Sequence, residues 1–307
     1  MLFRNATLFR FPKSAATDLA DTLEEQLATK VLRPCGKLEM ATRGWVSPYG
    51  RGQERLIVGM GSFRLLTLGG EDKLLPPAVV DAAVAEKIEV LESERGRPVG
   101  GRERRRLKEE VTEVLIPQAF VRPSRLSGYL DLEDGWLVVD TASRKAAEGF
   151  LTVLRDTLEG FPSVPPDPEE SPRALLTEWL TGSKLPEGIE LGDECELKDP
   201  ADQGAIVRCR RQDLEADEVR EHLKSGKLVA QLGLVVDERV SLVLGEDLTL
   251  RKLRFLDSAV ESVEADRRDG VEAEVDARFA VTTLTLKPLL SRLAGWFGLA
   301  RPLDRRA

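Results

Sequence analysis

Two neighbouring helical segments, bounded by prolines and glycines, constrain the fold of this chain more than any other feature. Pro76 and Pro77 open the first, residues 77–95, in which apolar residues recur at helical spacing. A stretch with glycine and proline ends it, and a second segment covers residues 102–116 before Pro117. Because strands are predicted on both sides, the pair predicts a helical hairpin inserted between strands.

The rest of the first half alternates between strand and helix patterns. The stretch from Pro34 to Gly50 is rich in glycine and proline and is expected to be irregular. Asp134-Gly135 is a strong turn signal between two predicted strands. The predicted strands are 2–11, 55–68 (broken near its glycines), 124–132 and 135–140, and the predicted helices are 14–29 and 143–158.

A proline-rich segment, residues 160–173, is the clearest linker in the chain. Beyond it we expect helices at 174–181, 216–225 and 288–299, and strands at 188–197, 204–211, 227–236, 239–244, 248–256 and 278–286. The predicted class is α+β, with two α+β units that contain antiparallel sheets and a helical-hairpin insertion in the first. The predicted domains are 1–75 with 121–165 (central domain), 76–120 (hairpin tip) and 166–307 (C-terminal base domain).

Composition narrows the function. The 307 residues include 53 acidic and 45 basic side chains, a net charge of −8, which excludes a uniformly basic coat protein but not a local basic surface. Cys35, Cys195 and Cys209 form no C-x-x-C motif, and His222 is the single histidine. With no P-loop or dinucleotide motif either, we expect no metal and no cofactor. No signal core or long apolar run occurs, so a cytoplasmic protein without membrane contact is expected.

The strongest local signal is the arginine-rich stretch at the predicted turn of the helical hairpin, residues 95–108. It carries seven positive residues and one acid, a charge of +6 over 14 residues. Its arginines fall in the first turns of the second helix, where the helix dipole already favours negative charge. An anionic ligand would remove this conflict, and guanidinium groups suit phosphate. A solvated hairpin tip without a ligand is the alternative.

Two weaker basic groups lie on predicted strands of the second half. They are Arg208, Arg210 and Arg211, and Arg251, Lys252 and Arg254. Together with the hairpin they suggest basic patches that share one concave surface. Aromatic residues are sparse near these arginines, so base stacking is not indicated and contacts to the phosphate backbone match better.

Four adjacent acidic pairs fall at predicted turns: Glu71-Asp72, Glu133-Asp134, Asp237-Glu238 and Glu246-Asp247. Acidic residues are common at turns for solvation and turn geometry, so we do not expect catalysis by them. A hydrolase or nuclease that uses a carboxylate cluster is kept as an alternative. It predicts metal-dependent turnover that is lost when one Asp or Glu is changed.

Two apolar features concern interfaces. Phe120, in the segment LIPQAF, either packs under the hairpin or contacts another protein chain. An apolar stripe on the last predicted helix indicates core packing or a subunit interface. The stripe consists of Leu289, Leu293, Trp296 and Phe297.

Several motifs, spread in order over nearly the whole chain, resemble the recombination-associated protein RdgC family of proteobacteria. Their collinearity and spacing carry the resemblance, since no single motif decides it. They are Pro34-Cys35-Gly36, Gly44-Trp45-Val46, Lys73-Leu74-Leu75-Pro76, LIPQAF (115–120), VVDTASRKAAE (138–148), LLTEWL (175–180), RCRRQDL (208–214) and LTLRKLRF (248–255).

The resemblance implies a non-enzymatic, cytoplasmic or nucleoid-associated protein whose horseshoe-shaped subunits close into a ring dimer around duplex DNA. It implies little sequence preference and a functional restraint of the RecA recombinase. Phe120 would match a phenylalanine at the hairpin–hairpin subunit contact, and the C-terminal unit would form the other interface. Arg210 and Arg211 would match a basic pair, whereas Gln118 stands where a basic residue is expected.

The leading hypothesis is therefore a non-catalytic homodimer that binds double-stranded DNA and restrains RecA-type recombination. The alternative is a regulator that acts mainly by direct binding to a recombination protein. The candidate dimer-interface residues are Phe120, Trp296 and Phe297. The candidate DNA contacts are Lys73, Arg97, Arg102, Arg104, Arg105, Arg106, Lys108, Arg125, Arg210 and Arg211.

Overall fold

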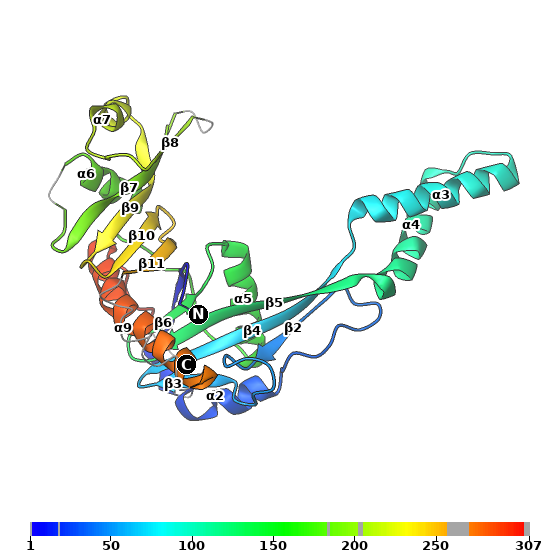
Figure 1. The fold of residues 1–307 in the computed structure, drawn as a ribbon, viewed down its shortest axis with the longest axis horizontal. Helices are drawn as coiled ribbons and strands as arrows, with labels where there is room; N and C mark the ends of the chain where they lie inside the picture. The colour runs from blue at the N-terminus through cyan, green and yellow to red at the C-terminus, as the bar shows by residue number, and fades with distance from the viewer. Residues whose placement is uncertain (1, 18, 183–184, 202–204, 257–269, 304–307) are drawn as a thin grey trace. The chain divides into compact units, whose positions relative to one another are not determined.

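A computed structural model describes residues 2–17, 19–182, 185–201, 205–256 and 270–303. The chain forms two compact units of an α+β fold, and the predicted class is thereby confirmed (Figure 1). Unit 1 consists of Met1–Thr29, Ser47–Thr67 and Leu126–Ala307, and unit 2 of Lys30–Val46 and Leu68–Arg125. The three-part division drawn from the sequence stays a prediction.

The first sheet of unit 1 has the strand order β1 (Thr7–Arg10), β6 (Trp136–Val139), β5 (Phe120–Asp131) and β4 (Phe63–Leu74), and β3 (Ile57–Met60) pairs with β4. The β5–β6 hairpin turns where the sequence predicts, because Gly135 supplies the left-handed backbone (φ 73°) that the turn requires. Three helices complete this part: α1 (Lys13–Thr17), α2 (Leu19–Ala28) and α5 (Arg144–Thr157).

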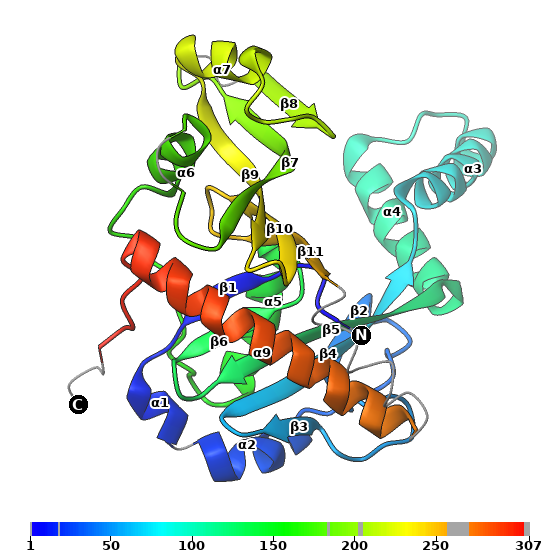
Figure 2. The ribbon, with the colours of Figure 1, turned by 60° about the vertical axis from the view of Figure 1, so that its left-hand side comes forward.

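The second sheet of unit 1 lies in the C-terminal half (Figure 2). Its strand order is β11 (Leu250–Phe255), β10 (Val240–Gly245), β9 (Leu228–Val236), β7 (Ile189–Lys198) and β8 (Ile206–Arg210). The helices α6 (Pro172–Leu180) and α7 (Asp217–Lys224) contribute Trp179 and Val219 to the same core as Cys195 and Leu232 of the sheet. One face of this sheet is therefore covered by helices, and within the described residues the opposite face is open.

The predicted strand 278–286 is wrong, because α9 is one continuous helix, Val271–Phe297, that includes Pro288. The run of β-branched residues before Pro288 imitates a strand pattern. In the helix, however, the hydroxyls of Thr282 and Thr283 donate to the carbonyls of Arg278 and Phe279 at 2.8 and 3.0 Å. The helix thus satisfies their polar groups inside a buried face.

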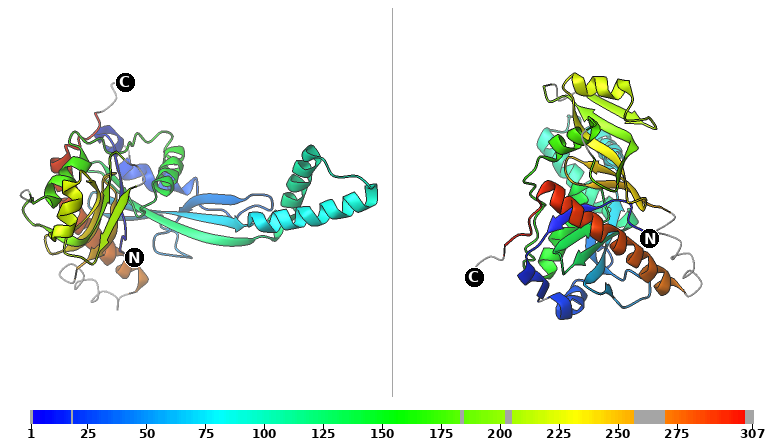
Figure 3. Two further views of the ribbon diagram at one scale, coloured as in Figure 1. Left: turned by 90° about the horizontal axis from the view of Figure 1, so that it is seen from above. Right: turned by 90° about the vertical axis from the view of Figure 1, so that its left-hand side faces the viewer.

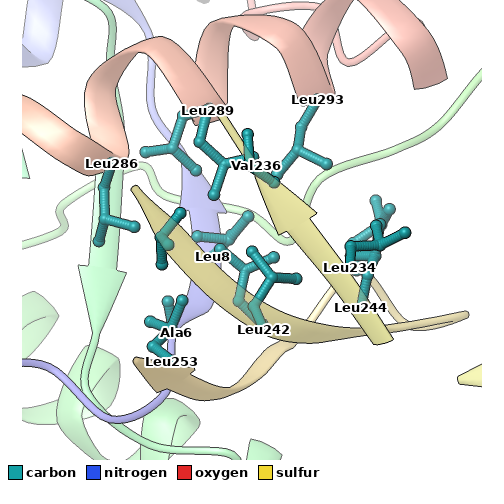
Figure 4. Close-up of a cluster of buried hydrophobic side chains, with 14 of the residues drawn as sticks. Ala6, Leu8, Leu234, Val236, Leu242, Leu244, Leu253, Leu286, Leu289 and Leu293 are labelled. Carbon is teal, nitrogen blue, oxygen red and sulfur yellow. The ribbon is translucent and has the colours of Figure 1, made fainter. Parts of the chain in front are cut away.

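Packing against the second sheet decides this helical state. Leu289 and Leu293 of α9 lie beside Val236 of β9 (Figure 4), and Leu286 and Leu234 belong to the same core. Each of these side chains is at most 3% exposed. Each such burial contributes on the order of 2 kcal/mol, which outweighs the weak local preference of β-branched residues for strands.

Unit 2 contains a strand that the sequence does not predict. Part of the stretch expected to be irregular forms β2 (Ala41–Val46), which pairs with β4 and buries Trp45 completely. Gly44 lies inside this strand. A glycine is required there because a Cβ would lie 2.4 Å from the backbone nitrogen of Leu32. The glycine marks a close approach of two backbones rather than the end of a strand.

The long strands β4 and β5 continue from unit 1 into unit 2 (Figure 3). In unit 2 they are joined by α3 (Pro77–Arg95), α4 (Gly101–Leu115) and the short 3-10 helix η1 (Ile116–Gln118). This is the helical hairpin that the proline and glycine pattern predicts. No helix of the described residues is both long and apolar enough to cross a membrane.

The proline-rich segment 160–173 contacts other parts of unit 1 at three points. The ring of Phe161 contacts that of Phe11 at a centroid distance of 5.0 Å. Val164 forms a β-bridge with Arg10, and the amide of Glu169 donates to the carbonyl of Phe297 at 2.9 Å. The residues on both sides of this segment belong to unit 1.

Candidate nucleic-acid interface

The tip of the helical hairpin has a fixed backbone path. Val84 of α3 and Val111 of α4 lie in one small apolar core. Gly96 ends α3 in the left-handed region (φ 65°), and the amide of Val99 donates to the Glu92 carboxylate at 2.8 Å. Since Val99 is itself buried, the loop between the helices is anchored on both sides.

Four of the seven tip cations face a carboxylate of the same hairpin. The pairs are Arg95–Glu103 (2.5 Å), Lys108–Asp81 (2.7 Å), Arg106–Glu110 (3.5 Å) and Arg104–Glu92 (3.9 Å). Such exposed pairs contribute little to stability, but they lower the local positive charge. Three of the four acids lie outside residues 95–108, so a charge count over that stretch alone overstates the charge of the tip.

The other three tip cations, Arg97, Arg102 and Arg105, are exposed. Within the described parts of the chain, no carboxylate lies within 4.0 Å of their guanidinium groups. Arg102 and Arg105 lie in the first two turns of α4, whose N-cap, Gly100, has no side chain to accept from the first amides. The structure therefore confirms the predicted conflict between these cations and the helix dipole.

Two candidate DNA contacts outside the tip, Lys73 and Arg125, differ sharply in the solvent exposure of their side chains. Lys73 is 8% exposed, and its ammonium donates to the carbonyls of Gly36 and Lys37 at 2.8 and 2.5 Å. It thus anchors the loop that precedes β2. Arg125, in the part of β5 that belongs to unit 2, is exposed.

Phe120, the first residue of β5, is 83% exposed. Of the two alternatives for this residue, packing under the hairpin is therefore wrong. Val114 and Val121 nearby in the chain are also exposed. An aromatic ring with this access is available for a contact with another protein chain.

In the apolar stripe of α9, core packing prevails over an interface. Leu289, Leu293 and Phe297 are at most 3% exposed. Trp296 and Phe297 both contact the ring of Trp179, at centroid distances of 5.3 and 6.0 Å. Trp296 alone in the stripe is half-buried and keeps access to a partner.

The two basic groups of the C-terminal half lie on the open face of the second sheet. Arg210 and Arg211 come from β8 and the residue after it, and Lys252 and Arg254 come from β11. All four line one hollow of about 880 Å³, together with residues of β7, β9 and β10. The strand order brings the two groups of cations to one face, although 40 residues of sequence lie between them.

Several cations of this face are held by acids. Arg208 pairs with Glu196 at 2.8 Å, Lys252 pairs with Glu194, and Arg251 pairs with Asp247 at 2.6 Å. Arg210, Arg211 and Arg254 are exposed. Within the described ranges, their guanidinium groups have no carboxylate within 4.0 Å.

The depth of the hollow is a feature that sequence analysis missed. Gly192 and Gly233 form part of its lining, and a Cβ on Gly192 would come within 2.9 Å of the Gly233 carbonyl carbon. Three residues of β7 (Gly192 to Glu194) lie opposite this single glycine of β9. The available signal was a glycine in the middle of each strand pattern.

The acidic pairs are engaged in the fold. Glu71-Asp72 lies within β4, so its predicted place at a turn is wrong; Asp72 pairs there with Arg43 at 2.6 Å. The remaining pairs contribute the ion pairs Glu133–Lys287, Asp237–Arg292, Glu246–Lys198, Glu246–Arg173 and Asp247–Arg251. Across the described residues, no three His, Cys, Asp or Glu side chains are grouped to hold a metal ion.

Two of the three thiols face each other inside the second sheet. Cys195 of β7 lies directly opposite Cys209 of β8, and both are buried. Burial, with a smaller effect of the Cys209 thiol, raises the pKa of Cys195 to about 12. The thiol is therefore neutral near pH 7 and a poor nucleophile.

Comparison with known proteins decides the family. A family model described as "RdgC: Putative exonuclease, RdgC" matches residues 1–300. The chain belongs to the RdgC family. A relative from Xanthomonas axonopodis pv. citri (strain 306) is 46% identical over 290 residues, which cover 94% of this chain and 95% of the relative.

A second relative, from Xylella fastidiosa (strain 9a5c), is 47% identical over 290 residues with the same coverage of both chains. Both RdgC relatives carry the name "Recombination-associated protein RdgC". The description of the family model names an exonuclease, whereas the names of the relatives refer to recombination. The resemblance stated from the sequence motifs is confirmed.

Proposed function

We propose that this RdgC-family protein binds duplex DNA without sequence preference and thereby restrains RecA-type recombination. The observation that carries the proposal is a set of exposed arginines without carboxylate partners in the described chain. The set consists of Arg97, Arg102 and Arg105 at the hairpin tip and Arg210, Arg211 and Arg254 at the hollow. Guanidinium groups bind phosphate oxygens well, and such contacts carry no sequence information. The names of the RdgC relatives support a role in recombination.

A homodimer that encloses the duplex is part of the proposal. Phe120 supports it, because an 83% exposed phenylalanine at the base of the hairpin gains most of its hydrophobic free energy only by contact with a second chain. A closed ring would slow dissociation from circular DNA, and the basic tip would lie near the enclosed duplex. The half-buried Trp296 is the remaining candidate for a second contact.

The proposed action is binding without catalysis. Members of the acidic pairs are engaged by cations, as in Asp237–Arg292 at 2.9 Å and Glu246–Lys198 at 2.9 Å. A carboxylate in such an ion pair is less available to hold a metal ion. This supports binding over hydrolysis, and incubation of labelled duplex with Mg²⁺ or Mn²⁺ tests it directly.

The affinity for a random-sequence duplex, measured across a salt series, tests the proposal. Phosphate neutralisation predicts a steep negative slope of log K against log salt, with the same value for unrelated sequences. No binding at low salt would refute DNA binding.

A recombinase inhibition assay with Arg97, Arg102 and Arg105 changed to Gln tests the link to recombination. The proposal predicts that inhibition falls together with DNA affinity. Inhibition that survives the loss of DNA binding would favour direct contact with a recombination protein instead.

A further inference from the structure

Two of the three cysteines of this chain occupy directly opposite positions on neighbouring strands. Cys195 of β7 pairs with Cys209 of β8, and the antiparallel register between these two strands has no shift. Directly opposite residues of an antiparallel pair have Cα atoms about 4.5–5.5 Å apart and Cβ atoms about 4.5–5.5 Å apart. A disulfide needs Cα atoms about 4.4–6.8 Å apart and Cβ atoms about 3.5–4.5 Å apart. A small approach of the two strands is therefore enough to join the two sulfur atoms.

Both thiols belong to the face of the second sheet that the helices cover. On the open face, the next pair of opposite residues, Glu196 and Arg208, forms an ion pair of 2.8 Å. Because side chains alternate between the two faces of a strand, Cys195 and Cys209 lie on the other face. There they are 4% and 8% exposed, in the core that also contains Val219 of α7. The two thiols thus share one side of the sheet and one apolar environment.

The strand that carries Cys209 is the outermost strand of its sheet. β8 is five residues long, and among the described residues it pairs with β7 alone. A short strand held by one neighbour belongs to the parts of a fold that open locally, at a lower free energy than the whole protein unfolds. Burial raises the pKa of Cys195, so its reactive thiolate is scarce while β8 stays in place. Local opening of β8 would expose both thiols and would set the rate of their oxidation.

We propose that Cys195 and Cys209 are a redox modification site, at which a reversible cross-strand disulfide fastens β8 to β7. The oxidant is a small disulfide of the glutathione class. The thiolate of one cysteine attacks a sulfur of this oxidant and releases one small thiol, which leaves a mixed disulfide on the protein. The thiolate of the other cysteine then attacks the protein sulfur and releases the second small thiol. The protein loses two electrons and two protons, the oxidant takes them up as two thiols, and a thiol reductant reverses both steps.

The bridge acts on the edge of the second sheet. It closes a loop of 15 residues, 195–209, and so restricts the unfolded chain, which stabilises the oxidised protein. Arg208 and Arg210 flank Cys209 in β8, so oxidation also holds these two cations at the sheet. The inference is independent of the proposed DNA binding, because the disulfide is measured on the protein alone.

Counting the free thiols by intact mass tests the inference first. In the variant Cys35→Ser only the opposed pair remains, so an intramolecular disulfide must join Cys195 to Cys209. The folded variant is held with oxidised glutathione until its mass no longer changes, then denatured and treated with iodoacetamide. We expect a chain that is lighter by two hydrogen atoms and carries no alkyl group, and two alkyl groups after reduction with dithiothreitol. Two alkyl groups without reduction, or glutathione adducts as the final product, would overturn the inference. The unchanged protein with Cys35 blocked beforehand gives the same measurement without a substitution.

Thermal unfolding then tests whether the bridge fits the native sheet. The oxidised form of Cys35→Ser should melt roughly 5 °C above the reduced form, and reduction should remove this difference. Cys35→Ser with Cys209→Ala is the matched control, since it keeps one thiol and can form only a glutathione adduct. The oxidant should leave the melting temperature of this control without a rise. A disulfide that lowers the melting temperature, or that forms only in urea-unfolded protein, would overturn the inference, because the native strands would then not hold the thiols in register.

Discussion

Neutralising the unpartnered arginines of the hairpin tip gives the sharpest test of the DNA binding proposed for this RdgC-family protein. The variant changes Arg97, Arg102 and Arg105 to Gln. Each direct phosphate contact contributes about 0.9 to the slope of log K against log salt, so the variant should lose up to about 2.7. Between about 50 and 200 mM salt, the affinity of the unchanged protein would then fall about 40-fold more than that of the variant.

The fold should survive this change, because all three side chains are exposed and make no carboxylate contact in the described chain. Surface substitutions of this kind alter the free energy of unfolding by about 0.5 kcal/mol or less. Fluorescence anisotropy with a labelled duplex measures the slope, and thermal unfolding confirms the fold.

A matched triple, Lys13, Arg51 and Arg220 to Gln, removes the same net charge from exposed positions elsewhere. If this triple lowers the slope as much as the tip triple, net charge alone explains binding and the role assigned to the tip is wrong. If neither triple changes the slope, the tip is a solvated end of the hairpin.

Four further outcomes are expected. Phe120→Ala should shift sedimentation from dimer to monomer with an unchanged melting temperature, and an unaltered profile would remove Phe120 from the interface. Lys73→Met should lower the free energy of unfolding by about 2 kcal/mol, because two carbonyls lose a charged donor. An unchanged urea unfolding curve would show that these two hydrogen bonds do not contribute to stability. Iodoacetamide should modify one thiol of the native protein, the half-buried Cys35, and three after denaturation; three fast native reactions would contradict the burial of the other two. Gly135→Ala should destabilise the protein by about 1 kcal/mol or more, since the φ of Gly135 is 73° and a Cβ would lie 2.5 Å from a carbonyl oxygen. The control Gly149→Ala, in open space within α5, should not destabilise the protein.

The helical hairpin and its basic tip are determined by the sequence itself. Prolines and glycines set the ends of α3 and α4 through their own backbone limits, and the arginine run falls at the start of α4 whatever surrounds it. The Asp134-Gly135 turn is equally local. Such features depend on residues close together in the chain, so a pattern contains them in full.

Other features were decided only by tertiary structure. α9 is helical rather than partly extended because its leucines pack on the second sheet, and Trp45 is in a strand because Gly44 lets two backbones meet. Phe120 is exposed, although a phenylalanine at this place in the sequence fitted a buried site equally well. Which cations remain without partners depends on acids that lie far away in sequence, such as Asp81 for Lys108 and Glu194 for Lys252. The hollow arises from strand order and two bulges. Contacts between distant residues set each of these outcomes, because the free energy of burying a side chain or pairing a charge is settled by its neighbours in space.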